Sequence, residues 1–560
     1  MKAKTGACGK IAGMTTDRRL ELNEQFLLAY ELMEKTDRNA FVTGKAGTGK
    51  STLLSYFRRN TDKKIVVLAP TGVAALNVRG QTIHSFFRFK PDITLSKVKK
   101  ARPKGGDNGS IYQNLDAIVI DEISMVRADL LDCVDRFMRL NGRTGRRPFG
   151  GVQMIFIGDL YQLPPVVTGE ERRIFKESYK SPYFFDAKLF EQGFEMDFVE
   201  LEKVYRQKDE RLLNVLNHVR NNTATEEHLR VLNEKCDPGF EPPSGDLYVY
   251  LTTTNALASE INEARLKRLK GSPVAAEGVI SGDFERKSLP TDVSLRLKVG
   301  AQVMLLNNDS DGRWVNGSIG RVTGIDRDDQ IVLKVDLSDG TTVEVSPYTW
   351  ELFNFTFDAE KRVVVSRKVG SFTQLPVKLA WAITIHKSQG KTFPKIILDM
   401  GRGAFAHGQT YVALSRCTTL EGLVLKKPLK KSHIFMDWKV VDFVTRYQYR
   451  LAERDCPLGD KVSILKDAAQ RKEPLEITYL KSQDVKSRRT ITPLLVEEME
   501  YLGKAFLGLK AFCGLRHQER VFRVDRILEI KRTAGATAGL RGSDPTDLQT
   551  VATPQGHPQS

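Results

Sequence analysis

The sequence lacks the features of a disulfide-stabilised, zinc-binding or membrane-spanning protein. Its 560 residues include only six cysteines, and none of them forms a C-x-x-C pair, which favours a reducing compartment such as the cytosol. No apolar run approaches the roughly 18 residues that a membrane-spanning helix needs. The first sixteen residues carry lysine and no acidic residue but have no apolar segment, so we expect a flexible arm and not a signal peptide.

The sequence is long and carries a large positive net charge. At roughly 150 residues per domain, the chain is long enough for three or four domains. Its formal net charge of +17 favours a polyanionic partner, and nucleic acid is the usual one. Binding to ribosomes or to a membrane surface would suit the same charge.

The stretch GKAGTGKS at residues 44–51 fits the phosphate-binding loop pattern G-x-x-x-x-G-K-[ST]. The apolar run NAFVTG precedes it and STLLSYFRR follows with helical spacing, which is the strand–loop–helix context that this motif requires. Its glycines allow backbone N–H groups to face phosphates, Lys50 would reach the β- and γ-phosphates, and Ser51 would hold Mg²⁺. The expected nucleotide contacts in the loop are Gly44, Ala46, Gly47, Thr48, Gly49, Lys50, Ser51 and Thr52.

A second apolar run, DAIVIDEIS, ends in the acidic pair Asp121 and Glu122. Such a pair is often only a solvated strand end. About 70 residues after a phosphate loop, however, it is typical of a magnesium-dependent hydrolase. We predict that Asp121 holds the metal and that Glu122 orients and deprotonates the attacking water.

Two further apolar runs, KKIVVLAPTG and MIFIGDLYQLPPV, end in turn-forming residues. Strands that alternate with helical segments predict a doubly wound α/β domain from about residue 20 to 200. After residue 200, LYVYLTTTN, KIILDM and GLVLKK read as buried strands of a second parallel sheet. Residues from about 305 to 375 alternate polar and apolar side chains between turn signals, which predicts a small antiparallel insertion.

The order of these segments resembles that of the superfamily 1B DNA helicases, in particular the PIF-type (petite integration frequency) group related to RecD. The resemblance covers roughly residues 20 to 430. Besides the phosphate loop, it rests on six segments of the sequence: LAPTGVAALNVRGQTIHSFF at 68–87, IDEISMV at 120–126, PFGGVQMIFIGDLYQLPPV at 148–166, LEKVYRQKD at 201–209, WAITIHKSQGKTF at 381–393 and TYVALSRCTTLEGL at 410–423.

The resemblance implies further roles at the nucleotide. Gln25 matches a glutamine that reads adenine, and Gln162 matches one that senses the γ-phosphate. Arg206 and Arg416 match two arginines that approach the γ-phosphate from the second motor domain, a task that suits a permanently charged group with several donors. Without the flanking YRQ and ALSRC, either arginine would read as an ordinary surface residue.

The same resemblance implies contacts with single-stranded DNA. They fall on the segment after a strand end, on TIHSFF and on IHKSQG, at Pro70, Thr71, Gly72, His84, Ser85, Phe86, His386 and Lys387. Backbone N–H groups and lysine would bind phosphates while an aromatic ring stacks on a base. For Phe86 and His84 the alternative is a place in the core, as a packed ring and a buried imidazole.

The domain organisation that we expect combines these patterns with the family. It comprises a flexible arm (1–19), a first motor domain (20–200) with a small wedge insertion near 88–112, a second motor domain (201–440) with an SH3-like insertion at about 305–375, a partly helical linker (441–472), a WYL-like Sm barrel (473–532) and a disordered tail (533–560). In the last barrel Leu507, Gly508 and Leu509 stand where the family has Trp, Tyr and Leu. Arg516, Arg520, Arg523 and Arg526 recur at three- and four-residue spacing, as a nucleic-acid grip or a solvated face.

The resemblance therefore implies two RecA-like motor domains and an enzyme: a DNA-dependent ATPase and DNA helicase of 5′-to-3′ direction that uses ATP and Mg²⁺. The expected partners are single-stranded DNA and forked or structured DNA, including G-quadruplexes, with no membrane contact. We expect a monomeric motor in a bacterial cytosol. A translocase or recombination-complex subunit would keep the same motifs, and a non-enzymatic nucleic-acid-binding regulator would not need them intact.

Overall fold

The computed structural model describes residues 22–532 apart from 102–110, 168–174, 176, 206–208, 244, 285–287, 359, 402, 404–405 and 482–483. The predicted arm and tail, residues 102–110 of the predicted wedge insertion and Arg206 lie outside the described residues. The chain divides into two compact units, the first ending at Val444 and the second beginning at Thr445.

The predicted first motor domain is built on a six-stranded sheet in the order β3-β2-β4-β5-β1-β6, and every pair of neighbours is parallel. Its strands are β1 (Ala40–Gly44), β2 (Ile65–Ala69), β3 (Gln81–Thr82), β4 (Ala117–Ile120), β5 (Gln153–Ile157) and β6 (Asp197–Leu201). Its helices are α1 (Glu24–Lys35), α2 (Lys50–Asn60), α3 (Gly72–Asn77), α4 (Ile83–Phe87), α5 (Ile111–Asn114), α6 (Ala128–Asn141) and α8 (Lys188–Glu191).

The central strands of this sheet are formed by the apolar runs of the sequence. Every residue of β1, β4 and β5 is buried, as expected for central strands of a parallel sheet with helices on both faces. Their carboxyl ends carry the phosphate loop, the pair Asp121 and Glu122, and the turn containing Gln162. The sequence predicted all three strands, and parallel alignment brings the following loops to one edge of the sheet.

The predicted second motor domain has a smaller parallel sheet in the order β18-β7-β19-β20. Its strands are β7 (Val249–Thr252), β18 (Ala382–Thr384), β19 (Ile396–Leu398) and β20 (Leu423–Leu425), and its helices are α9 (Glu210–Arg220), α10 (Glu226–Asn233), α11 (Asn255–Arg268) and α12 (Gln409–Leu414). The predicted fold class, with two parallel-sheet motor domains, is therefore confirmed.

Between β7 and β18 of this second sheet, the chain forms a series of antiparallel strands. Five of them form a sheet in the order β14-β13-β12-β11-β17, and three form a sheet in the order β15-β16-β9, while β8 and β10 make a separate pair. The strands are β8 (Val274–Glu277), β9 (Val279–Gly282), β10 (Ser294–Leu297), β11 (Gln302–Leu305), β12 (Ile319–Asp326), β13 (Val332–Leu337), β14 (Thr342–Val345), β15 (Tyr348–Asp358), β16 (Val363–Gln374) and β17 (Val377–Leu379). They extend beyond the predicted insertion because β8–β11 precede it.

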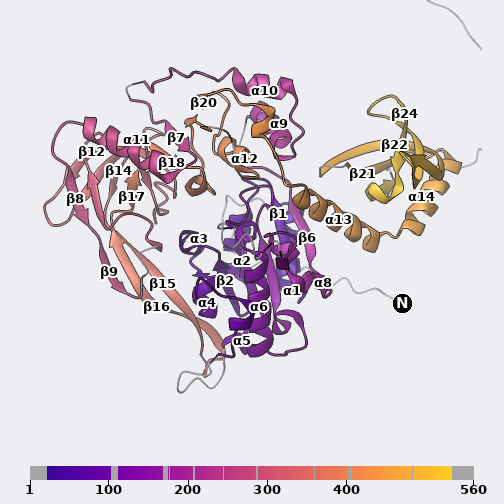
Figure 1. The fold of residues 1–560 in the computed structure, drawn as a ribbon, viewed down its shortest axis with the longest axis horizontal. Coiled ribbons are helices and arrows are strands. Elements are labelled where there is room, and N and C mark those ends of the chain that lie inside the picture. The colour runs from indigo at the N-terminus through magenta and orange to yellow at the C-terminus, as the bar shows by residue number, and fades with distance from the viewer. Residues whose placement is uncertain are drawn as a thin grey trace, which may run out of the picture. The chain divides into compact units, whose positions relative to one another are not determined.

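The long hairpin formed by β15 and β16 runs from the second motor domain toward α5 of the first (Figure 1). It is bonded there through Gln81, whose amide nitrogen donates to the side-chain oxygen of Asn354 and whose amide oxygen accepts from the Phe355 N–H at 3.3 Å. The Phe355 ring lies 6.4 Å from that of Phe86. The hairpin therefore contacts the first motor domain at β3, the edge strand of its sheet.

The second unit is a five-stranded antiparallel sheet in the order β24-β23-β22-β21-β25. Its strands are β21 (Leu475–Lys481), β22 (Val485–Tyr501), β23 (Lys504–Cys513), β24 (Gln518–Arg523) and β25 (Ile527–Arg532). Helix α14 (Leu458–Arg471) contributes Leu465 and Ala468 to the core of this sheet. The predicted linker (441–472) therefore consists largely of α14 and of α13 (Trp438–Asp455).

Candidate functional site

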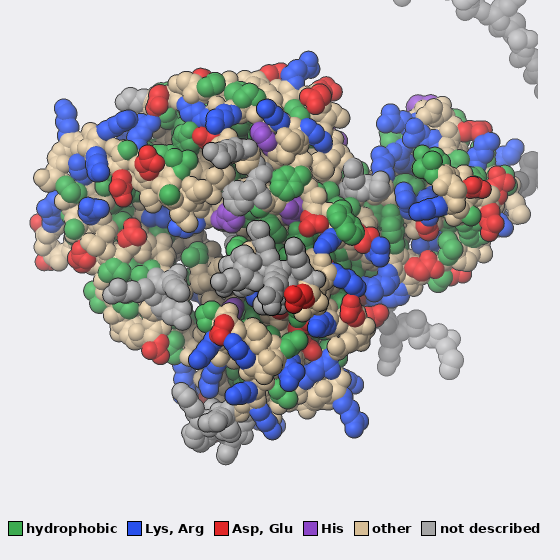
Figure 2. Space-filling view, viewed as in Figure 1, with side chains coloured by type: hydrophobic (Ala, Val, Ile, Leu, Met, Phe, Trp, Pro, Cys, Tyr) green, Lys and Arg blue, Asp and Glu red, His purple; other side chains and the backbone are tan. Residues whose placement is uncertain are grey.

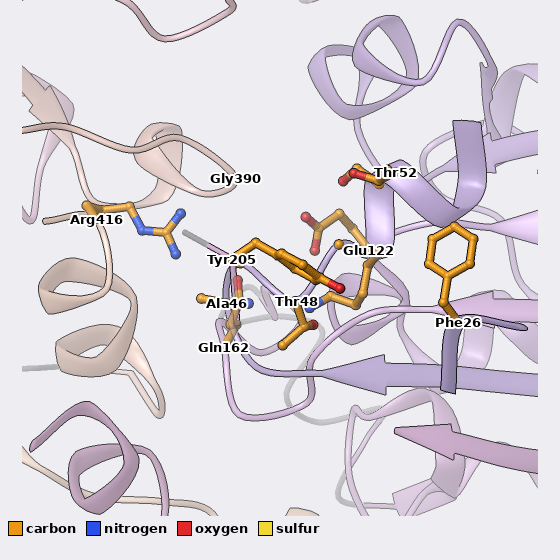
Figure 3. Close-up of a pocket in the computed structure, with 13 residues that line it drawn as sticks. Phe26, Ala46, Thr48, Thr52, Glu122, Gln162, Tyr205, Gly390 and Arg416 are labelled. Carbon is orange, nitrogen blue, oxygen red and sulfur yellow. The ribbon is translucent and has the colours of Figure 1, made fainter. Parts of the chain in front are cut away.

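A pocket of about 540 Å³ lies at the carboxyl edge of the first sheet and is completed by the second motor domain. Its lining residues are Phe26, Ala46, Gly47, Thr48, Gly49, Lys50, Ser51, Thr52, Glu122, Gln162, Tyr205, Gly390 and Arg416. Figure 3 shows Arg416 pointing into the pocket from the side opposite Glu122 and Thr48. Residues more than 200 positions apart thus face one space.

The phosphate loop has the backbone that its sequence predicts. Gly47 and Gly49 have φ values of +81° and +90°, which favour glycine, and Gly49 caps the N-terminus of α2. The Lys50 ammonium folds over the loop and donates to the carbonyls of Gly44 and Lys45 at 2.7 and 2.9 Å. A glycine-rich loop at a helix N-terminus, with a lysine across it, suits phosphate oxygens.

Both predicted carboxylates lie at this edge, but their surroundings differ from open solvent. Burial, followed by the neighbouring Asp121, raises the pKa of Glu122 to about 7. Burial also raises the pKa of Asp121, although the charge of Lys50 opposes this. One oxygen of Glu122 accepts from the Gln389 amide at 3.0 Å. Glu122 itself has a φ of +50°, an unusual backbone conformation for this residue type that recurs at functional sites.

The side chains near the two carboxylates could hold Mg²⁺ only if water and phosphate oxygens complete its coordination shell. Ser51 lines the pocket with an exposed side chain, and Asp121 follows β4 at the same edge. Within the described ranges, no group of three or more His, Cys, Asp or Glu side chains is arranged to hold a metal ion. Mg²⁺ commonly takes one or two protein ligands and fills its shell with water and phosphate oxygens, so one hydroxyl and one carboxylate suit it.

Gln162 and Arg416 come from different domains and both line the pocket. The Gln162 amide donates to Asp159 at 3.1 Å. Arg416 is fully buried, and its guanidinium donates to the carbonyls of Val412 and Lys391 at 2.8 and 3.0 Å. These bonds fix the guanidinium within its own domain, so its position relative to the phosphate loop depends on how the two domains approach.

Three pocket residues were not predicted from the sequence: Phe26, Tyr205 and Gly390. The Tyr205 hydroxyl accepts from the Asn23 amide at 3.0 Å, and the Tyr205 N–H donates to the Gly47 carbonyl at 2.9 Å. Tyr205 directly precedes Arg206 in the segment LEKVYRQKD. Its place in this segment is the sequence signal from which it could have been predicted. Gln25, Gly44 and Asp121 were predicted here but do not line the pocket.

The first DNA-contact candidates lie at the start of α3. Thr71 is exposed and caps this helix, because its hydroxyl accepts from the Ala74 N–H at 3.2 Å. Pro70 and Gly72 are half-buried. A Cβ on Gly72 would come within 2.4 Å of the Ser288 hydroxyl oxygen. The glycine therefore permits close approach of the segment that carries Ser288 in the second motor domain.

The other candidates differ in exposure. Ser85 and Lys387 are exposed, and His84 and His386 are half-buried, with burial lowering the pKa of His386. Phe86 is wrong as a base-stacking residue. Its side chain is only 5% exposed and packs against the rings of Phe87, Tyr112 and Phe355. The core alternative therefore holds for this residue, because a ring enclosed by other rings has no free face for a base.

The C-terminal arginines divide into two kinds. Arg523 is paired with Asp525 at 2.7 Å. Arg516 and Arg520 are exposed, whereas Arg489 is buried. The pKa of Lys481 is lowered by burial and by the positive charges of these three arginines. The four cations therefore lie close together. Elsewhere, Lys and Arg side chains are spread among acidic ones over the face that Figure 2 shows. None of the described helices combines the length and apolar character needed to cross a membrane.

Comparison with known proteins gives the family. Residues 23–229 match the model described as PIF1-like helicase, and residues 460–532 match the WYL domain. The ATP-dependent DNA helicase Pif1 of Bdellovibrio bacteriovorus is 33% identical over 452 residues, which cover 79% of this chain and 95% of that protein. The chain belongs to the PIF1-like helicase family. The family predicted from the motifs is thereby confirmed.

Solved structures of Pif1 from Bacteroides sp. resemble this PIF1-like helicase over the same region. The complex with ADP-AlF4 has a TM-score of 0.70, and the complex with ssDNA has a TM-score of 0.56. Both are 38% identical and cover 77% of this chain and 98% of the Bacteroides chain. The WYL match begins at residue 460, inside the segment predicted as a linker, because α14 belongs to the core of that unit.

The burial of Glu122 predicts a pH-dependent stability. Because its pKa rises from 4.5 to about 7 on folding, the folded protein binds a proton more tightly than the unfolded chain. The contribution to stability is therefore full below pH 4.5 and is lost as the pH rises through 7. We expect Glu122→Gln to raise the free energy of unfolding at pH 8.5, on the order of 1–3 kcal/mol, and to have a smaller effect at pH 5.5.

Urea denaturation of the nucleotide-free protein at the two pH values measures this difference. Glu260→Gln, which changes an exposed carboxyl on α11, serves as the control. Equal effects of Glu122→Gln at pH 5.5 and 8.5 would contradict the assignment of a raised pKa to Glu122.

Proposed function

We propose that this DNA helicase hydrolyses ATP between its two motor domains and uses the change in their spacing to move 5′-to-3′ along single-stranded DNA. The observation that carries the proposal is the composite pocket. Its phosphate loop belongs to the first motor domain and Arg416 to the second. A ligand that contacts both sides favours the closed spacing, and a product that loses one contact favours the open one.

Nucleotide binding is assigned to the loop and to one ring. The N–H groups of residues 46–52 and the Lys50 ammonium would hold the phosphates. Tyr205 lines the same pocket with an exposed side chain and would offer an apolar face to the base. Gln25, next to the pocket residue Phe26 in the sequence, would read the adenine. Ser51 and Asp121 would hold Mg²⁺, which neutralises charge on the transferring phosphate when bound.

Hydrolysis is assigned to four side chains. Glu122 would accept the proton of the attacking water, and its charged fraction rises as the pH passes through its pKa of about 7. Gln162 would orient this water or the γ-phosphate. Arg416 would place positive charge where the transferring oxygens gain negative charge. Arg206 has the same role in our proposal on the ground of the family motif alone.

The DNA strand would cross both domains, so that each nucleotide state grips it differently. Thr71 and Ser85 offer exposed hydroxyls on the first domain, and Lys387 an exposed ammonium on the second. The Bacteroides relative supports a rearrangement on DNA, because the same protein resembles this chain with different TM-scores in its ADP-AlF4 and ssDNA complexes. Each base-pair step that the motor opens costs about 1.4 kcal/mol of stacking.

The proposed substrates are single-stranded, forked and structured DNA, including G-quadruplexes, with the protein acting as a monomer in the bacterial cytosol. Solved Pif1 structures bound to ssDNA and at forked dsDNA support the first two substrates. The relative from Bdellovibrio bacteriovorus supports a bacterial setting. A translocase that remodels protein–DNA complexes would use the same motor without separating strands.

Direction is tested with two matched duplexes, one with a 5′ single-stranded tail and one with a 3′ tail. We expect ATP and Mg²⁺ to drive opening of the 5′-tailed duplex only, because the proposed motor loads on one strand with a fixed polarity. Lys50→Ala should still bind single-stranded DNA and should lose hydrolysis and opening, since its phosphate contact is removed.

Three results would change the proposal in different ways. Opening of the 3′-tailed duplex alone would keep the motor and reverse its direction. DNA-stimulated hydrolysis without strand separation would favour the translocase. Normal turnover by Lys50→Ala would remove the phosphate-loop assignment.

The WYL-type unit is proposed as an additional grip on single-stranded DNA. Its support is the group of four cations formed by Lys481, Arg489, Arg516 and Arg520, whose mutual repulsion is relieved when phosphates bind. The replacement of the family's Trp-Tyr-Leu triad by Leu507, Gly508 and Leu509 leaves these cations as the part of the unit best suited to a polyanion.

Salt titration of binding to single-stranded DNA tests this grip. Arg516→Ala combined with Arg520→Ala should lower the log–log salt slope by about 1–2, because about one phosphate contact is lost per side chain. Lys466→Ala combined with Lys504→Ala removes the same charge from other exposed positions of the unit. An equal loss of slope in both double variants would show that only net charge matters.

A further inference from the structure

A buried carboxylate stands directly behind Gln162. Asp159 follows β5 by two residues and is only 1% exposed. Its carboxylate accepts from the Gln162 amide and from the Tyr161 N–H, each at 3.1 Å. These two bonds fix the turn that presents Gln162 to the pocket. They come from the same turn as the carboxylate, so they do not by themselves connect it to the rest of the molecule.

The connection comes from the second motor domain. Arg220, the last residue of α9, is 4% exposed, and its guanidinium donates to Asp159 at 3.3 Å. The guanidinium also lies over the Tyr161 ring, 3.9 Å from its centroid. Burial opposes the charge of Arg220, but Asp159 and the surrounding tyrosines raise its pKa above the ordinary value. A buried pair of this kind is costly to break because one charge is then left alone.

The backbone of the same turn is enclosed by a second segment of that domain. A Cβ on Gly408 would come within 2.4 Å of the carbonyl oxygens of both Tyr161 and Gln162. One ring nitrogen of His407 lies 3.0 Å from the Leu160 carbonyl. Close by in the sequence, the Tyr411 hydroxyl accepts from the Ala46 N–H of the phosphate loop at 3.0 Å. The turn and the loop are thus both in direct contact with the second domain.

The helix that ends in Arg220 begins near the other pocket residues. Its N-cap, Asp209, accepts from the Leu212 N–H at 3.0 Å and from the Leu420 N–H at 2.8 Å. Leu420 lies four residues after Arg416, and Tyr205 precedes the helix by five residues. One rigid helix therefore links the segment that carries Arg416 to the carboxylate behind Gln162.

We propose that Arg220 is a positioning residue of the motor, which acts through Asp159 to hold Gln162 in the nucleotide pocket and to transmit movement of the second motor domain to it. The inference rests on the proposed function of the pocket and adds a residue that none of the sequence motifs contains. A salt bridge that served stability alone would not affect how DNA changes the rate of hydrolysis. The kinetic effect of DNA is therefore the decisive readout.

The test compares ATP hydrolysis with and without single-stranded DNA in three arginine variants of the full chain. Arg220→Lys keeps the charge but loses the fork of donors, and Arg220→Gln removes the charge. Arg230→Gln, on the exposed face of the neighbouring helix α10, is the matched control. We expect Arg220→Gln to lower the DNA-stimulated kcat by about tenfold or more, with the KM for ATP changed by less than about threefold, because the phosphate loop is intact.

A double-mutant cycle separates this role from a structural one. If Arg220 acts through Gln162, Arg220→Lys should lower the DNA-stimulated kcat by about threefold or more in the wild-type background and by less than about twofold in a Gln162→Ala background. Binding of a fluorescent ADP analogue and the thermal unfolding midpoint confirm that each variant is folded. If Arg220→Gln does not fold, Arg220→Lys decides the question alone.

Wild-type DNA stimulation in the folded Arg220→Lys and Arg220→Gln variants would overturn the proposal and leave the pair as a structural salt bridge. Equal effects of Arg220→Lys with and without Gln162 would overturn it as well. Failure of the wild-type protein and of Arg230→Gln to show any DNA-stimulated hydrolysis would overturn the proposed function itself, and this inference with it.

Discussion

The placement of charge between the two motor domains is the constraint on which the rest of this structure depends. Arg416, Arg220 and Asp159 are almost completely buried there, and charged groups can be buried only when other groups satisfy them. Arg416 is satisfied by carbonyls of its own domain, whereas Arg220 is satisfied across the interface by Asp159. The first arrangement fixes a guanidinium within one domain, and the second ties the domains together.

This difference explains how one pocket can both hold a nucleotide and respond to it. The phosphate loop and the turn of Gln162 belong to the first sheet, but Tyr411 and Arg220 contact them from the second domain. A shift of the second domain therefore changes the distance of Arg416 from the loop while it acts on Gln162 through Asp159. The hairpin of β15 and β16 adds a remote contact at Gln81, beside the segment that carries Ser85. The same domain movement would also act on this contact.

The sequence predicted those features that depend on local pattern. Buried apolar runs gave β1, β4 and β5, and glycine spacing gave the phosphate loop with its left-handed Gly47 and Gly49. It did not predict Phe26, Tyr205 or Arg220, because their importance arises from which surfaces meet in three dimensions. Phe86 shows the opposite error. A motif placed it on DNA, and the rings packed around it show that it is part of the core.

The central claim is that nucleotide state sets the spacing of the motor domains and thereby the grip on DNA. The most direct measurement is the dissociation constant for single-stranded DNA, by fluorescence anisotropy, without nucleotide, with ADP and with ADP-AlF4. The account predicts constants that differ between these states by about tenfold or more, which corresponds to a coupling free energy of about 1.4 kcal/mol. It predicts a much smaller difference in Arg416→Ala. Equal affinities in all three states of the wild-type protein would contradict it.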